Sequence, residues 1–349
     1  MSSSTHLKSF AIPLSLVVLV LSVLAAMQAG AVRLDREVWF SLWSGDSALF
    51  TTSHHGDMYV LWYLRTPRVI LAVLIGAALG LAGCLVQGLF RNPLADPSLL
   101  GVTTGAASAA ALTIVFWSGQ GLMMSGELKM WVLPFASFLG ALLTCLTLNS
   151  SSRWLSSNSV AGLLLLGIAL NALGVAVIGL CTYLATDEQL RSLSFWTLGS
   201  LAGANWPTVL LMCLTLMLVY VWSLRLAQRL NALSLGENTA AHLGIVVNRL
   251  RWSISVMVAL LAGLSVAFCG VIGFVGLIAP HLARAMVGAD QRALIPLSML
   301  MGALLMLTAD TIARTIAIPA EVPIGIFTAL LGGPFLMLLL RAARYRGGA

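Results

Sequence analysis

Long stretches without an acidic or basic residue alternate with short charged stretches along nearly the whole chain. Nine of them are long enough for a membrane-spanning helix, which needs about 17–25 mostly apolar residues. One of them, the seventh, has room for a full helix and a shorter return, and Gly270, Gly273, Gly276 and Pro280 suit a sharp turn within it. The pattern therefore predicts an all-α polytopic membrane protein with about ten transmembrane helices. The stretches are Ser9–Val32, Val69–Phe90, Pro97–Gly126, Met130–Ser152, Trp154–Thr186, Ser192–Leu224, Trp252–Ala283, Ala293–Ala309 and Val322–Leu340.

Composition supports this interpretation. Of 349 residues, 59% are hydrophobic and 9% are charged, whereas a soluble domain has about 45–50% apolar and about 25% charged residues. A soluble enzyme and a disordered chain are therefore excluded. The stretches follow one another so closely that residues 1–349 are expected to form a single transmembrane domain. The first stretch is longer than the apolar core of a cleaved signal peptide, about 7–15 residues, so we expect a retained helix.

The distribution of lysine and arginine predicts the orientation in the membrane. If the N-terminus lies inside and ten helices alternate, twelve of the 19 basic residues fall on the inner side and seven on the outer side. Short cytoplasmic loops are enriched in lysine and arginine. We therefore expect both termini in the cytoplasm of a multi-pass inner-membrane protein, and the net charge of +7 needs no nucleic-acid partner.

Little in the chain indicates chemistry of its own. The five cysteines are far apart in apolar stretches, which is typical neither of a disulfide framework nor of a zinc site. The first seven predicted spans contain no charged residue, and Asp310 and Arg314 lie near the outer end of the ninth, so an ion-driven carrier has little to use. His281 is more typical of a structural residue than of a ligand. Lys8 and Lys129 both follow leucine, so a phosphate-binding loop is not indicated, and ATP-driven transport would need a separate ATPase.

The longest predicted inner loop runs from Arg225 to Arg251, its centre is Ala232–Ile245, and its cytoplasmic part is expected at about 228–251. Gly236 and Gly244 can each end a short helix, which leaves a short polar helix between them. Composition alone favours equally an ATPase-docking surface and an ordinary solvated loop.

Small residues spaced by four recur in the predicted spans. The pairs are Gly76/Gly80, Gly101/Gly105 and Gly199/Gly203. Such spacing lets membrane helices approach closely, so we expect these glycines to pack rather than to form a site.

Several motifs, in this order, resemble the FecCD family of permease subunits of type II ABC importers for siderophores, heme and cobalamin. The resemblance runs from about Arg65 to about Arg341. It implies the permease fold of ten helices per subunit, a second permease subunit, two ATPase subunits that bind ATP and Mg, and a periplasmic binding protein. This chain itself would bind no cofactor and would be no enzyme. The motifs are Arg65–Arg68 (RTPR), Ile75–Gly80 (IGAALG), Gln87–Pro97 (QGLFRNPLADP), Leu100–Gly105 (LGVTTG), Ala232–Gly244, Gly273–His281 (GFVGLIAPH), Pro323–Gly325 and Gly332–Phe335.

The resemblance also implies roles for individual residues. Three outer arginines would dock the binding protein; alternatively, Arg65 and Arg68 only anchor a helix end at the membrane interface. Asn92 could equally be only a turn former before Pro93. The matching residues are Arg65, Arg68 and Arg314 for docking; Leu235, Gly236, Glu237, Ala240, Ala241 and Gly244 for ATPase coupling; and Asn92, Leu94, Ser156 and Ser157 for the cytoplasmic gate.

The segment Leu190–Trp206 looks most like the heme permeases of this family. The resemblance therefore favours heme as the transported substrate, with a ferric siderophore or cobalamin as alternatives. It implies a pathway lined mainly by the fifth, eighth and tenth helices and a homodimer, although a heterodimer of related permeases stays open. An ion-coupled secondary carrier and a non-transporting membrane scaffold are the rival interpretations from other classes.

Overall fold

The computed structural model describes residues 3–30, 55–117, 126–155 and 160–347. In these residues every regular element is helical. A π-helical segment, Val60–Arg65, leads directly into α4, another, Thr113–Trp117, extends α5, and Pro97–Leu100 forms a turn of 3₁₀ helix. The helices are α1 (Ser3–Gln28), α3 (His55–Tyr59), α4 (Thr66–Phe90), α5 (Val102–Leu112), α6 (Gly126–Leu155), α7 (Val160–Leu184), α8 (Asp187–Leu198), α9 (Trp206–Ser234), α10 (Glu237–His242), α11 (Val247–Cys269), α12 (Val275–Val287), α13 (Gln291–Thr315) and α14 (Ile324–Gly347).

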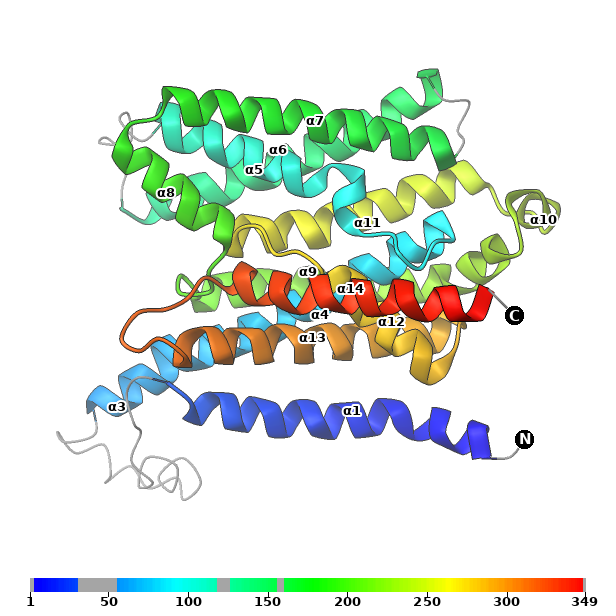
Figure 1. The fold of residues 1–349 in the computed structure, drawn as a ribbon, viewed down its shortest axis with the longest axis horizontal. Coiled ribbons are helices and arrows are strands. Elements are labelled where there is room, and N and C mark those ends of the chain that lie inside the picture. Colours follow the sequence, from blue (N-terminus) through cyan, green and yellow to red (C-terminus); the bar gives the residue numbers. More distant parts are fainter. Residues whose placement is uncertain (1–2, 31–54, 118–125, 156–159, 348–349) are drawn as a thin grey trace.

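The helices match the ten predicted spans. Seven are long and apolar enough to cross a membrane, and three shorter apolar helices lie at Val102–Trp117, Val275–Val287 and Ile324–Leu339. The long helices run side by side along one direction (Figure 1). Both described ends of the chain lie at the same end of this bundle as α10, which we call the α10 end; α3 and α8 lie at the opposite end, the α8 end (Figure 1).

Helix α4 forms the centre of the bundle. It packs against α9, α11, α12 and α13, and most of its residues are buried. Its sequence is apolar on all sides, as expected for a helix surrounded by other helices. By contrast, α1 packs mainly on α13, and one side of it is exposed.

Two of the three predicted glycine pairs pack as expected. Gly76 and Gly80 lie against backbone carbonyls of α13, and Gly105 lies against the backbone of α6. A Cβ atom at these positions would overlap the neighbouring helix. The third pair differs, because open space surrounds Gly203.

Replacing Gly83 with alanine is expected to destabilise the fold by about 3 kcal/mol, because the new Cβ would overlap the carbonyl oxygen of Gly276 in α12. Gly179 is the matched control, since it is also helical and has nothing within 4 Å of an added Cβ. Thermal unfolding of the detergent-purified variants measures both effects. Equal midpoints for Gly83→Ala and Gly179→Ala would contradict the close approach of α4 and α12.

The predicted break within the seventh apolar stretch is confirmed. Helix α11 ends at Cys269, and α12 begins at Val275. Gly270 and Phe274 have φ values of 74° and 67°, so the backbone turns through the left-handed region at both ends of the break. Gly276 and Pro280, which were expected to contribute to the turn, lie within α12 instead.

The sixth apolar stretch is not one helix. Helix α8 ends at Leu198, and α9 begins at Trp206 after an Asn205 cap whose side chain accepts a hydrogen bond from Thr208 N. Helix α9 then continues past Arg225 and Arg229 to Ser234, because exposed arginines are good helix formers. The loop expected at about 228–251 therefore shortens to residues 235–246, with α10 inside it.

Candidate functional site

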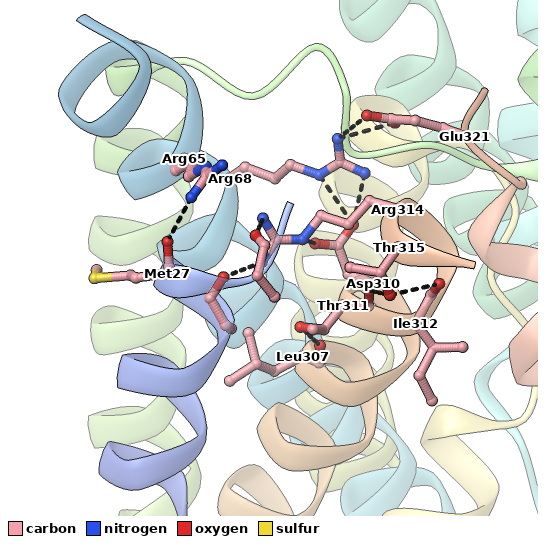
Figure 2. A network of polar contacts seen from close by, with 12 residues as sticks. Met27, Arg65, Arg68, Leu307, Asp310, Thr311, Ile312, Arg314, Thr315 and Glu321 are labelled. Carbon is pink, nitrogen blue, oxygen red and sulfur yellow. Dashed lines mark hydrogen bonds and ion pairs between the residues drawn. The ribbon is translucent and has the colours of Figure 1, made fainter. Parts of the chain in front are cut away.

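A charged network lies at the α8 end, where α4, α13 and the segment after α13 meet (Figure 2). Arg68 donates hydrogen bonds from Nε and Nη2 to one carboxylate oxygen of Asp310, at 3.0 and 2.9 Å. Its Nη1 also binds both carboxylate oxygens of Glu321, at 2.7 and 2.9 Å. The Asp310 side chain is 1% exposed, whereas that of Glu321 is 43% exposed. Arg68 therefore joins a buried acid to an exposed one.

The other two arginines of this network hold the end of α1. Arg65 Nη1 donates to the carbonyl of Met27 at 3.0 Å, and Arg314 donates to the carbonyls of Ala26 and Ala29. The last carbonyls of a helix lack partners within the helix and carry partial negative charge. Both guanidinium groups thus stabilise the C-terminus of α1, and both residues are buried.

The structure brings together the three arginines predicted to dock a binding protein. Arg65 and Arg314 both donate to carbonyls at the end of α1, as helix anchors do, and Arg314 also pairs with Asp310 at 3.6 Å. Arg68 differs, because its second carboxylate partner, Glu321, faces outward. Docking stays a prediction for all three residues.

At the α10 end, the predicted short helix is present. Gly236 and Gly244, with φ values of 118° and 80°, bound α10, which spans Glu237–His242. Ala240 is fully buried, whereas Ala241 and Gly244 are exposed. Leu235 and Leu243, immediately outside α10, are 69% and 62% exposed. Exposed apolar residues beside a short helix suit a contact with another protein.

The first residue of α10 connects three elements. The Glu237 carboxylate accepts a hydrogen bond from Arg251 of α11 at 2.6 Å and lies 3.8 Å from the Arg91 guanidinium. Arg91 has a φ of 52° and forms the C-cap of α4. Glu237 was expected to contact the ATPase, but its carboxylate also holds α10 to α11 and to the end of α4.

Asn92 follows Arg91 and forms the predicted turn. Its side-chain oxygen accepts a hydrogen bond from Leu94 N at 2.9 Å, and its carbonyl accepts one from Ala95 N at 3.1 Å. These two hydrogen bonds close a turn around Pro93. The gate role of Asn92 and Leu94 stays a prediction, and Ser156 and Ser157 lie outside the described residues.

Comparison with known proteins agrees with the motifs and the fold. The family model described as the FecCD transport family matches residues 16–342. This chain belongs to the FecCD transport family.

Relatives of this FecCD protein cover nearly its whole length. The hemin transport system permease protein HmuU of Yersinia pestis is 42% identical over 95% of this chain and 96% of its own. The vitamin B12 import system permease protein BtuC of Pectobacterium atrosepticum is 40% identical over 94% and 92%. A solved structure described as a metal-chelate type ABC transporter in an inward-facing conformation matches with a TM-score of 0.81 and 33% identity, over 95% of this chain and 98% of that one. The chain is thus a multi-pass membrane permease subunit of an ABC importer.

In this FecCD permease, α12 and α14 are the eighth and tenth membrane helices, which were expected to help line the pathway. They contact each other. The ring of His281 lies edge-on to that of Phe335, with 5.7 Å between their centres. The ring of Phe274 lies where a Cβ at Gly332 would be. A groove of about 460 Å³ lies beside Phe274, between the ends of α8 and α14. It is a candidate part of the pathway.

Sequence analysis missed the roles of two charged residues, one inside a motif and one beside a motif. Arg91 lies inside the quoted motif QGLFRNPLADP, and Glu321 precedes Pro323 by two positions. The signal for Arg91 was its position immediately before Asn92, a turn former. Sequence order gives no signal for the contact between Arg68 and Glu321, because they lie 253 residues apart.

Proposed function

We propose that this permease imports heme across the bacterial inner membrane by ATP-driven alternating access. In this proposal it pairs with an identical subunit, and two separate ATPase subunits bind ATP and Mg at the α10 end. A periplasmic binding protein delivers heme at the α8 end. Both described ends of the chain lie at the α10 end, so both termini would then be cytoplasmic.

The observation that carries the coupling mechanism is the position of Glu237. Its carboxylate contacts Arg251 of α11 and lies near Arg91, so a displacement of α10 would pull on α11 and on the turn that holds Asn92. An ATPase that moves α10 would therefore move the proposed gate directly. Exposed Leu235 and Leu243 beside α10 give the ATPase an apolar contact.

At the α8 end, Arg68 is the best placed of the three docking candidates. The Arg68 side chain is 12% exposed and its partner Glu321 is 43% exposed, so a carboxylate of the binding protein would replace Glu321 at the guanidinium. Charge pairs of this kind guide encounter more than they determine affinity. Arg65 and Arg314 would support docking by holding α1 and α13 in place.

Heme is favoured by the hemin permease at 42% identity over 95% of the chain. Cobalamin is the second candidate, because vitamin B12 permeases reach 40% identity over a similar length. Substrate choice in such a system would depend largely on the binding protein that delivers the ligand.

Uptake by proteoliposomes tests the proposal. The permease is reconstituted with its ATPase and its binding protein, with and without internal ATP. Heme, cobalamin and a ferric siderophore are offered in parallel. We expect ATP-dependent accumulation of heme and no accumulation without ATP.

Each outcome separates one part of the proposal from the others. ATP-dependent accumulation of cobalamin or of the siderophore would replace heme and leave the mechanism standing. Uptake driven by a pH or sodium gradient without ATP would contradict ATP coupling.

A further inference from the structure

The α10 end of α9 reaches the depth of lipid headgroups. Helix α9 starts at Trp206 at the α8 end, and a helix crosses a hydrocarbon core of about 30 Å in about 20 residues. Counted from Trp206, the core would therefore end near Leu226. Arg225 and Arg229, one on each side of it, are exposed at the boundary where phosphate groups of the membrane lie.

A cavity of about 370 Å³ opens at this depth between α9 and α11. Arg229 of α9 and Arg249 of α11 line it, together with Trp222 and residues 243–246. Within the described part of the chain, no carboxylate pairs with either arginine. The cavity therefore presents two positive charges without a matching negative charge.

A shallow apolar groove lies along one face of α9. Its volume is about 650 Å³, and it is lined by Leu214, Met217, Leu218, Val221, Trp222 and Arg225. Trp222 lines both the cavity and the groove. A basic cavity and an apolar groove that share Trp222 match the two chemically different parts of a phospholipid.

We propose that this cavity and groove bind one anionic phospholipid, with its phosphate at Arg229 and Arg249 and an acyl chain along α9. Guanidinium groups bind phosphate oxygens through paired hydrogen bonds. Basic pockets between transmembrane helices at the cytoplasmic side are typical sites for such headgroups. The indole of Trp222 suits the boundary between headgroup and chain.

The bound lipid would hold the connection between α10 and α11. Gly244, with a φ of 80°, and the exposed Val246 lie on the cavity wall, immediately after α10. A phosphate bound to Arg229 and Arg249 would join this segment to α9. The inference requires only that α9 and α11 span a membrane, and it does not depend on which substrate is transported.

Native mass spectrometry of the delipidated full-length permease in detergent tests the proposal. Phosphatidylglycerol, cardiolipin, phosphatidylcholine and inorganic phosphate are added separately. We expect retention of one anionic lipid per chain, at least tenfold better than phosphatidylcholine. Arg249→Gln should weaken retention about fivefold and the double variant with Arg229→Gln about 25-fold, because each arginine near a membrane surface contributes about a factor of five.

Arg292→Gln is the matched control, since Arg292 is exposed near the start of α13 and does not line the cavity. Equal retention of phosphatidylcholine, or equal losses for Arg249→Gln and Arg292→Gln, would overturn the proposal. Displacement of the lipid by millimolar phosphate would identify a site for a free anion instead. Loss of ATPase binding with unchanged lipid retention would assign the two arginines to the ATPase interface, and would also overturn it.

Discussion

Replacing Glu237 with arginine is expected to reduce ATP-driven uptake at least tenfold while the chain still inserts into the membrane. The new guanidinium would lie next to those of Arg251 and Arg91, where the native carboxylate accepts a 2.6 Å hydrogen bond. A hydrogen bond to a charged group contributes about 1.5–3 kcal/mol, and its loss here is joined by like-charge repulsion. Helix α10 would then detach from α11. Uptake, ATPase co-purification and membrane insertion are measured on the same preparation.

Two further variants separate docking from coupling. Arg91→Gln keeps the Glu237–Arg251 pair, so the ATPase should still bind, but uptake per ATP hydrolysed should fall because the gate turn is no longer linked to α10. Arg292→Gln removes an exposed charge near the start of α13 and should change neither quantity. Normal uptake by Glu237→Arg would contradict the coupling assignment. An unchanged ratio of uptake to hydrolysis in Arg91→Gln would contradict the link to the gate turn.

The helix ends that lie at glycines were predictable from the sequence. Gly236 and Gly244 adopt positive φ values on both sides of α10, as their positions in a polar loop indicated. Gly270 does the same where α11 ends. Few other residue types adopt these backbone angles at low cost, so a glycine between helical segments carries local structural information. Such information needs no knowledge of distant contacts.

The limits of α8 and α9 were not predicted, because absence of charge does not distinguish one helix from two. The stretch Ser192–Leu224 is free of charge, yet a break lies inside it. The sequence did contain a local signal for the start of α8. Thr186 and Gln189 form a reciprocal N-terminal cap for α8, with the Thr186 hydroxyl accepting from Gln189 N and the Gln189 side chain accepting from Thr186 N.

The contacts of charged side chains with distant residues were the main feature that could not be predicted from the sequence. The partners Arg68 and Asp310 lie 242 positions apart, and Arg314 binds carbonyls at the end of α1, 285 or more positions away. Helix α4 begins at Thr66, before its charge-free stretch, and Arg68 in its first turn pairs with Asp310. Only the packing of α1, α4 and α13 creates these contacts.

The two ends of the bundle differ in how their ion pairs are buried. At the α10 end, the Glu237 side chain is 34% exposed, so water can replace its partners when α10 moves. At the α8 end, Asp310 is 1% exposed and sits between Arg68 and Arg314. Buried pairs are costly to separate, because each charge would be left without water. This difference indicates a movable link at the α10 end and a fixed one at the α8 end.

Asp310→Asn is therefore expected to destabilise the protein by about 3–5 kcal/mol, because it leaves two guanidinium groups beside a neutral amide in a buried site. The matched change Glu321→Gln should cost no more than about 1 kcal/mol, since that carboxylate is largely exposed. The thermal unfolding midpoint of the purified protein in detergent measures both, with a shift of roughly 2–4 °C expected for each kcal/mol.

A double variant identifies the cause of the loss. If uncompensated charge destabilises Asp310→Asn, adding Arg68→Gln should recover part of the stability, because removing both partners of a buried pair costs less than removing one. If lost packing were the cause, the second substitution would lower the midpoint further. Equal midpoints for Asp310→Asn and Glu321→Gln would show that Asp310 is hydrated, and the α8 end would then be as free to rearrange as the α10 end.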